Sequence, residues 1–322
     1  MKTDDQFVAR LLDRDRPGIA RAISMVEAGG EAARRLLDNI YPRTGRAYRV
    51  GITGPPGAGK STLAGEIARI LRQSGHTIAI VAVDPTSPFT SGALLGDRVR
   101  MADLDNDEDV FIRSMATRGT GGGLGASTAD AADIFDAAGF DYIFIESAGV
   151  GQTELDVRHL VDTTVVVLAP EAGDQVQAAK AGLMEIADIF VMNKCDRPGS
   201  GTAMQSIQSA LSFRNHGNEH WQARIIETVA SESRGTVELV EEIMRHKTCL
   251  QTTNKHGELL QKRVERRVRS SVRHAVDRQV WSAENEQRLE DALPQILSGK
   301  LAPADVVAQI CTNITASGKT DE

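Results

Sequence analysis

Short apolar runs alternate with amphipathic stretches between residue 48 and about residue 247. The runs are rich in β-branched residues and nearly continuous in apolar character, which is typical of parallel strands buried on both faces. They predict seven strands, in the segments "YRVGIT" at 48, "TIAIVAV" at 77, "VFIRSM" at 110, "DYIFIES" at 141, "TTVVVLA" at 163, "DIFVMNK" at 188 and "ARIIETVA" at 223. The pattern therefore predicts a doubly wound α/β domain with a mostly parallel sheet. Ligands of such sheets bind beyond the carboxyl ends of the strands.

The two flanks of this domain have helical spacing instead. Apolar residues recur at intervals of three and four along residues 1–45, and the same spacing returns in the last quarter of the chain. We therefore expect an N-terminal helical extension over residues 1–45, the α/β domain over 46–250 and a C-terminal helical region over 251–322.

An apolar stripe with a period of four residues runs through the C-terminal region. Its members are Leu260, Val264, Val268, Val272, Val276 and Val280. Because a helix turns once per about 3.6 residues, such a stripe rotates by about 40° per step, and its two ends face different directions. We infer that one end packs on its own domain and the other on a second chain. The alternative is a single core helix with some exposed valines.

Composition narrows the classes of partner. The 322 residues have a hydrophobic fraction of 41% and a net charge of −7, which opposes nonspecific binding to nucleic acid or to an anionic membrane. The basic stretch "QKRVERRVRSSVRHAVDR" lacks interleaved aromatic residues, as expected for a solvated helix face. No apolar run reaches the roughly 20 residues that span a bilayer, and the N-terminus is too acidic for a signal peptide. We expect a cytoplasmic protein that binds neither nucleic acid nor membrane.

The segment "GPPGAGKS", residues 54–61, fits the phosphate-loop pattern G-x-x-x-x-G-K-[ST]. It lies between a predicted strand and the helical stretch "STLAGEIARIL", as this motif requires. Its glycines let backbone N–H groups converge on phosphates, Lys60 reaches the β and γ oxygens, and the Ser61 hydroxyl binds Mg²⁺. Thr62 is the neighbouring hydroxyl and not the expected metal ligand. Nucleotide binding is assigned to Gly54, Gly57, Ala58, Gly59, Lys60, Ser61 and Thr62.

A second motif, "NKCD" at residues 193–196, follows the strand "DIFVM". In the N-K-x-D element of GTPases, the aspartate accepts from N1–H and the 2-amino group of guanine. The asparagine supports the base edge and its loop, and the lysine stem packs over the ring. Adenine leaves the carboxylate unsatisfied, and such pairing can reject a wrong base by about 10⁴. Asn193, Lys194 and Asp196 therefore favour GTP over ATP.

Between the two motifs lies "ESAG", residues 146–149, at the end of the strand "DYIFI". Its position is that of the D-x-x-G element, in which the acid holds the Mg²⁺ shell and the glycine N–H meets the γ-phosphate. Here the acid is Glu146, whose longer side chain suits a water-mediated contact to magnesium, and the glycine is Gly149. A solvated glutamate at a strand end is the alternative.

Two more carboxylates follow the second strand in "VDPTSPFTSGALLGDRVRM". Asp84 and Asp97 stand in a segment rich in Gly, Ser, Thr and Pro, where they could complete the Mg²⁺ shell and polarise a water molecule. Either could instead cap a helix. We assign Lys60, Asp84, Asp97 and Glu146 to catalysis, and Ser61, Asp84, Asp97 and Glu146 to the metal.

Taken together, these blocks resemble the MeaB/ArgK family of P-loop GTPases, the chaperones of adenosylcobalamin-dependent acyl-CoA mutases. The resemblance covers residues 10–312 and includes "DPTSPFTSGALLGDRVRM", "FIRSMATRG", "ESAGVGQTELD" and "GDQVQAAKAGLMEIADIFVMNKCDRPG". It implies a P-loop NTPase fold of the SIMIBI type, Mg²⁺-dependent hydrolysis of GTP to GDP, and a homodimer formed through the C-terminal helices. Adenosylcobalamin would belong to the partner mutase, either methylmalonyl-CoA mutase or an isobutyryl- or 2-hydroxyisobutyryl-CoA mutase.

The resemblance also implies a further switch segment that couples the nucleotide state to the mutase. It falls on Asp174, Gln177 and Lys180. Two segments depart from the family pattern. Glu171 and Ala172 stand where relatives more usually have proline and glycine, and "TVASESRG" is a loose version of the loop that completes the base pocket.

Gln152 invites comparison with the water-positioning glutamine of Ras-type GTPases. That glutamine directly follows the glycine of D-x-x-G, whereas Val150 and Gly151 separate Gln152 from Gly149. We therefore expect Gln152 to contact switch loops or the dimer partner. The alternatives to a mutase chaperone are a nickel-insertion GTPase, an ATP-dependent kinase of a transport protein, and a scaffold that binds nucleotide without hydrolysis. For the nickel alternative, His216 and His220 lack a third ligand in the sequence.

Overall fold

The computed structural model describes residues 2–85, 101, 104, 106–117, 126–147, 153–170, 182–212 and 221–317. The chain divides into two compact units, residues 1–257 and 258–322. Each unit is described by itself.

Three helices open the first unit. They are α1 (Lys2–Leu12), α2 (Arg16–Ala28) and α3 (Glu31–Ile40), followed by a 3-10 turn over Tyr41–Arg43. The Asp15 side chain caps α2 by accepting from the N–H of Gly18, and Pro17 occupies the first turn, where its missing N–H costs nothing. The helical spacing predicted for this segment is confirmed.

All seven predicted strands form, and they build one sheet. The strands are β1 (Tyr48–Thr53), β2 (Ile78–Pro85), β3 (Val110–Thr117), β4 (Tyr142–Glu146), β5 (Thr163–Leu168), β6 (Ile189–Met192) and β7 (Arg224–Glu227). Their order is β3-β2-β4-β1-β5-β6-β7, and every pairing is parallel. The doubly wound parallel fold is therefore confirmed. The strand order reverses beside β1, where ligands bind in such sheets.

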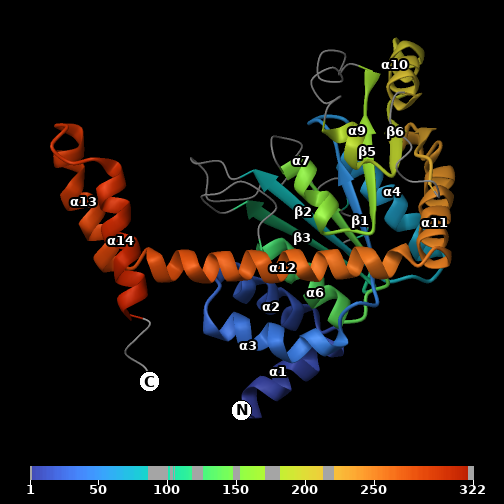
Figure 1. Ribbon diagram of the computed structural model, residues 1–322. Helices are drawn as coiled ribbons and strands as arrows, with labels where there is room; N and C mark the ends of the chain where they lie inside the picture. The colour runs from blue at the N-terminus through green and yellow to red at the C-terminus, as the bar shows by residue number, and fades with distance from the viewer. Residues whose placement is uncertain are drawn as a thin grey trace. The chain divides into compact units, whose positions relative to one another are not determined.

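Helices cover both faces of the sheet (Figure 1). The three N-terminal helices and α6 (Ala126–Ala137) pack on the face that carries Ala79, Val81 and Ile143. Ile78 and Ile80 point to the other face and are fully buried as well. That face is covered by α4 (Lys60–Gln73) and α11 (Thr236–Thr252), which contact the strands and each other.

Shorter elements complete the first unit after β4. They are α7 (Thr153–Asp156), a 3-10 turn η2 (Val157–His159), α9 (Leu183–Ile186), α10 (Ser200–Ser212) and a 3-10 turn η4 (Ala230–Glu232). A buried ion pair fixes the start of β1, because the Arg49 guanidinium lies 2.8 Å from Asp133 and 2.9 Å from Asp136. Asp136 also accepts from the backbone N–H groups of residues 45–47. A single carboxylate thus ties the incoming chain to α6.

The second unit contains α12 (Lys255–Val280) from Glu258 onward, then α13 (Ala283–Leu297) and α14 (Pro303–Ser317). Its small core consists of Ala292, Val306 and Ile310, with Val280 and Leu289 among the residues packed against it. The four valines of the predicted stripe between residues 264 and 276 are exposed, by 36% to 57%. In the described part of the chain, no helix combines the length and the apolar character that a membrane crossing needs.

Candidate nucleotide-binding site

The phosphate loop connects β1 to α4, and its glycines are required by its geometry. Gly54, Gly57 and Gly59 have φ values of 135°, 76° and 93°, which disfavour other residues. A Cβ atom on Gly54 would lie 2.0 Å from the carbonyl oxygen of Val167, and one on Gly59 would lie 2.3 Å from Nδ2 of Asn193. The loop is therefore wedged between β5 and the segment that follows β6.

Lys60 begins α4 and is buried. Its ammonium donates to the carbonyl oxygens of Gly54, at 2.8 Å, and Pro55, at 3.1 Å. The side chain thus curls back over the loop, beside the amino end of the helix. Backbone N–H groups and a lysine at a helix N-terminus are the chemistry that binds phosphate oxygens.

Ser61 and Glu146 come together at the same edge of the sheet. Oγ of Ser61 donates to Oε1 of Glu146 at 2.7 Å, and both side chains are buried. Glu146 ends β4, directly beside Ile52 of β1, so the pairing of the two strands fixes its position. A hydroxyl and a carboxylate are oxygen ligands of the kind that Mg²⁺ takes beside nucleotide phosphates. These two residues fit a magnesium site completed by phosphate and water.

The electrostatics near the loop involve a further acid, Glu154 of α7. Burial raises the pKa of its carboxyl, and the positive charge of Lys60 opposes this shift. The carbonyl oxygen of Glu154 accepts a 3.1 Å hydrogen bond from Oγ1 of Thr53, so α7 is anchored at the end of β1. Phosphates bound at Lys60 would raise that pKa further, because like charges disfavour ionisation.

Asn193 lies directly after β6 and is 2% exposed. Its Nδ2 atom donates to the carbonyl oxygen of Ala58 in the phosphate loop at 2.8 Å. Its Oδ1 atom accepts from Oγ1 of Thr228 at 3.0 Å and from the N–H of Ala230 at 3.1 Å. One side chain therefore holds three loops together, and these loops surround the carboxyl ends of β1, β6 and β7.

The rest of the N-K-C-D motif leads away from this anchor toward the surface. Lys194 adopts a left-handed conformation with φ at 60°, which is uncommon for a residue with a side chain. The N–H of Cys195 donates to the carbonyl oxygen of Thr228 at 3.2 Å, and Asp196 is exposed. A non-glycine residue held in this region points to a functional constraint on the turn.

Comparison with known proteins places the chain in a family. A family model described as "Methylmalonyl Co-A mutase-associated GTPase MeaB" matches residues 19–285. The chain belongs to the MeaB family. It is therefore a GTPase, and the resemblance drawn from its motifs is confirmed.

Relatives of this MeaB-family chain match it along most of its length. A protein of Pyrococcus horikoshii described as a GTPase is 45% identical over 96% of this chain and 98% of that protein. "Methylmalonic aciduria type A homolog, mitochondrial" of Mus musculus is 34% identical over 73% of this chain and 61% of that protein. Among solved structures, "Crystal structure of LAO/AO transport system kinase" matches 98% of each chain with 27% identity and a TM-score of 0.74.

Several of the predicted site residues lie outside the described residues. These are Asp97, Gly149, Gln152, Asp174, Gln177 and Lys180, together with His216 and His220. Asp84 lies on β2, where it pairs with Ala116 of β3, and its side chain is not described. Within the described part of the chain, no group of three or more His, Cys, Asp or Glu residues could hold a metal ion. The described residues thus bring together Ser61 with Glu146, and the phosphate loop with Asn193.

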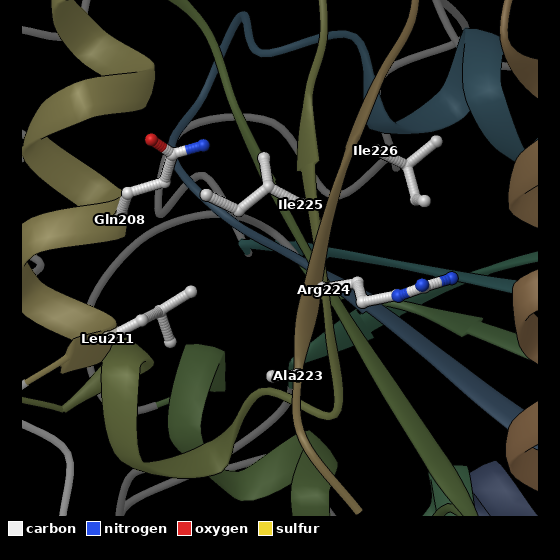
Figure 2. Close-up of a pocket in the computed structure, with 6 residues that line it drawn as sticks. All are labelled: Gln208, Leu211, Ala223, Arg224, Ile225 and Ile226. Carbon is white, nitrogen blue, oxygen red and sulfur yellow. The ribbon is translucent and has the colours of Figure 1, made fainter.

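The sequence analysis named the segment "TVASESRG" but did not predict that Thr228 and Ala230 in it bind Asn193. The available signal was their position, since they follow a strand whose carboxyl end lies at the same sheet edge as the other motifs. A separate hollow lies between α10 and β7 (Figure 2), lined by Gln208, Leu211, Ala223, Arg224, Ile225 and Ile226. None of the predicted site residues lines it.

Proposed function

We propose that this GTPase hydrolyses GTP to GDP and phosphate to gate the loading, protection or reactivation of an adenosylcobalamin-dependent acyl-CoA mutase. The partner is methylmalonyl-CoA mutase or a related isobutyryl- or 2-hydroxyisobutyryl-CoA mutase. The description of the MeaB family and the name of the mouse relative support the mutase assignment. The observation that carries the nucleotide assignment is Asn193, whose side chain joins the phosphate loop to the guanine motif.

Hydrolysis in this site relies on positioning and charge rather than on covalent chemistry. The backbone N–H groups of residues 54–61 and the ammonium of Lys60 hold the β- and γ-phosphates. Water attacks the γ-phosphorus, the bond to the GDP oxygen breaks, and the proton of the water leaves with the phosphate product. Burial of Lys60 strengthens its attraction for the charge that develops on the phosphate oxygens.

Ser61 and Glu146 are proposed to hold Mg²⁺, with Asp84 and Asp97 completing its shell and orienting the water. When bound, the ion neutralises charge on the phosphate oxygens and orients them. The 2.7 Å hydrogen bond between Ser61 and Glu146 supports this assignment, because it places two oxygen ligands side by side.

Guanine is proposed to bind at Asp196 and Lys194. The carboxylate of Asp196 accepts from N1–H and the 2-amino group, a pairing that adenine cannot offer. Asp196 is exposed, which supports access of the base. The ATP-dependent kinase suggested by the name of the solved relative predicts the opposite preference. Competition of ATP against labelled GTP separates the two, and we expect ATP to fail.

The coupling elements belong to the same proposal. Asp174, Gln177 and Lys180 form the switch that reports the nucleotide state to the mutase, and Gln152 contacts the neighbouring switch loops or the second protomer. Two chains associate through the C-terminal helices, and the exposed valines of α12 support this homodimer. We place the protein in the cytoplasm, with no nucleic-acid or membrane partner. The nickel-insertion alternative gains no support from the described residues.

The proposal is tested by capture of the partner. The tagged chain is incubated with extract of its source organism, once with GDP and once with a nonhydrolysable GTP analogue, and the captured proteins are identified. We expect an adenosylcobalamin-dependent acyl-CoA mutase whose recovery differs between the two nucleotides. Recovery of no such mutase, or equal recovery with GDP and with the analogue, would contradict the gating role.

A further inference from the structure

The loop after β7, residues 228–235, is folded tightly on itself and is called the base loop below. Val229 and Arg234 form an isolated bridge, with backbone N–H to carbonyl distances of 3.0 and 3.3 Å. Ser233 adopts a left-handed conformation with φ at 54°, and the hydroxyl of Thr236 donates to its carbonyl oxygen at 2.9 Å. This backbone leaves the hydroxyl of Ser233 free to reach outward from the loop.

That hydroxyl donates to a carboxylate on the phosphate-loop helix. Oγ of Ser233 lies 2.5 Å from Oε2 of Glu66, on α4. The other carboxylate oxygen of Glu66 pairs with the guanidinium of Arg69, and the Glu66 side chain is only 13% exposed. Hydrogen bonds to a charged acceptor are stronger than neutral ones, and here the acceptor is largely buried while Ser233 is exposed. The base loop is therefore tied to the helix that begins at Lys60.

The base loop is held at two separate points. On its inner side, the N–H of Ala230 donates to Asn193, which also binds Ala58 of the phosphate loop. On its outer side, Ser233 binds Glu66. The outer tie ends on α4, and the inner tie reaches the phosphate loop through Asn193. The two halves of the nucleotide site are therefore joined through side chains as well as through the sheet.

We propose that Glu66 is a positioning residue for the guanine pocket, which holds the base loop on α4 without touching the nucleotide. This inference rests on the proposed assignment of guanine to Asp196 and the loops beside it. It assigns a function to the "SESRG" portion of the chain, whose sequence departs from the family pattern for this loop. Here the shape of the loop depends on a contact with α4 in addition to its own residues.

The proposal predicts different effects on the binding of the base and on the binding of the phosphates. The phosphates are assigned to residues 54–61, whereas the Glu66 carboxylate binds Ser233 and Arg69. Loss of the tie should loosen the base loop and weaken binding of the base, while binding of the phosphates alone is unchanged. Inorganic tripolyphosphate reports the phosphate part, and GDP reports both parts.

The test compares these two ligands by titration calorimetry on the full chain. The variants are Glu66→Ala, Ser233→Ala, the double variant, and Glu66→Gln, which keeps an acceptor for the hydroxyl. The matched control is Glu241→Ala, which removes an exposed acid from α11. Each single alanine variant should weaken GDP binding about five- to tenfold, the loss expected for one hydrogen bond to a charged group.

The double variant should bind GDP no more weakly than the weaker single variant, because both changes remove one interaction. Glu66→Gln keeps a neutral acceptor for the hydroxyl and should lose less GDP affinity than Glu66→Ala. The control should stay within about twofold of the original chain, and tripolyphosphate binding should not change. Steady-state hydrolysis should show a raised KM with an unchanged kcat.

Three results would overturn the proposal: unchanged GDP affinity in both alanine variants, equal losses for GDP and tripolyphosphate, or losses that add in the double variant. Failure of the underlying guanine assignment has a different signature. Asp196→Asn should reverse the base preference, so that the variant binds the xanthine nucleotide more tightly than the guanine nucleotide. If that variant still prefers guanine, the assignment of Asp196 fails whatever Glu66 does.

Discussion

Ser61 donates a 2.7 Å hydrogen bond to Glu146, which lies 85 positions further along the chain. The first residue belongs to the start of α4 and the second ends β4, so the contact exists only because β4 pairs with β1. Both are withdrawn from water. The hydrogen bond joins the phosphate loop to the acid of the E-S-A-G segment, and these two side chains would hold Mg²⁺.

Substitution of Ser61 or Glu146 should slow GTP hydrolysis without weakening nucleotide binding. We expect Ser61→Ala and Glu146→Gln to lower Mg²⁺-dependent GTP turnover by about 100-fold or more, because an ion that neutralises phosphate charge loses a ligand. GDP affinity measured in EDTA should stay within about twofold, since it does not use the ion. Ser61→Thr keeps the hydroxyl and serves as the control. Turnover at the original rate in Ser61→Ala would contradict the metal assignment.

Gly59 and Gly57 form a matched pair of left-handed glycines with different surroundings. A Cβ atom on Gly59 would collide with Asn193, whereas one on Gly57 meets no atom within 4 Å. In the nucleotide-free chain, Gly57→Ala should lower the free energy of unfolding by about 1 kcal/mol through backbone strain alone. Gly59→Ala should lower it by about 3 kcal/mol or more, because the collision adds to the strain. Equal losses in urea denaturation would show that Asn193 does not press on the loop.

His246 makes the stability of the first unit depend on pH. Its ring is 2% exposed, and Nδ1 lies 2.8 Å from Oγ1 of Thr163. Burial lowers the pKa of His246 below its ordinary value of 6.5, and the charge of Asp188 opposes the shift. The unfolded chain therefore binds a proton that the folded chain resists, so stability is lost as pH falls below about 6.5.

The prediction is checked by urea denaturation between about pH 8 and pH 5. The original chain should lose more stability across this range than His246→Gln, whose side chain does not titrate. The difference between them should approach at most about 1.4 kcal/mol per pH unit, the limit for one proton. At pH 8 both side chains are neutral, which gives the reference. Parallel curves for the two proteins would contradict the assigned direction of the pKa shift.

Much of this fold could be predicted because its signal is local. Residues Val165–Val167 of β5 are buried on both faces of the sheet, and such an uninterrupted apolar run is visible in any short window of sequence. The contacts of the site are not local. Asn193 meets Ala58 across 135 positions, and Glu66 meets Ser233 across 167, so neither pair leaves a pattern in sequence spacing.

The stripe on α12 is a case in which sequence showed the pattern but not the partner. Val280 packs on the core of the second unit, while Val268 and Val272 are each 57% exposed. A period of four in apolar residues predicts a helix face, but burial depends on what faces it. The middle of the stripe, at Val268 and Val272, is therefore exposed in the single chain. That a second chain covers it stays a prediction.

That prediction concerns the oligomeric state. Val268→Asp combined with Val272→Asp should convert a dimer to a monomer in light scattering, because two charges cannot be buried in an apolar contact without partners. Val237→Asp, at a residue of α11 that is 51% exposed, is the control and should leave the dimer intact. A wild-type monomer, or a double variant that remains dimeric, would exclude this surface as the dimer contact.

The most direct test of the central claim is the rate of GTP hydrolysis by the purified chain, measured alone and with a purified adenosylcobalamin-dependent acyl-CoA mutase. A site that works by positioning, with loops completed by a partner, should turn over slowly in isolation and at least about tenfold faster with the mutase. A rate already fast in isolation and unchanged by any such mutase would contradict the account.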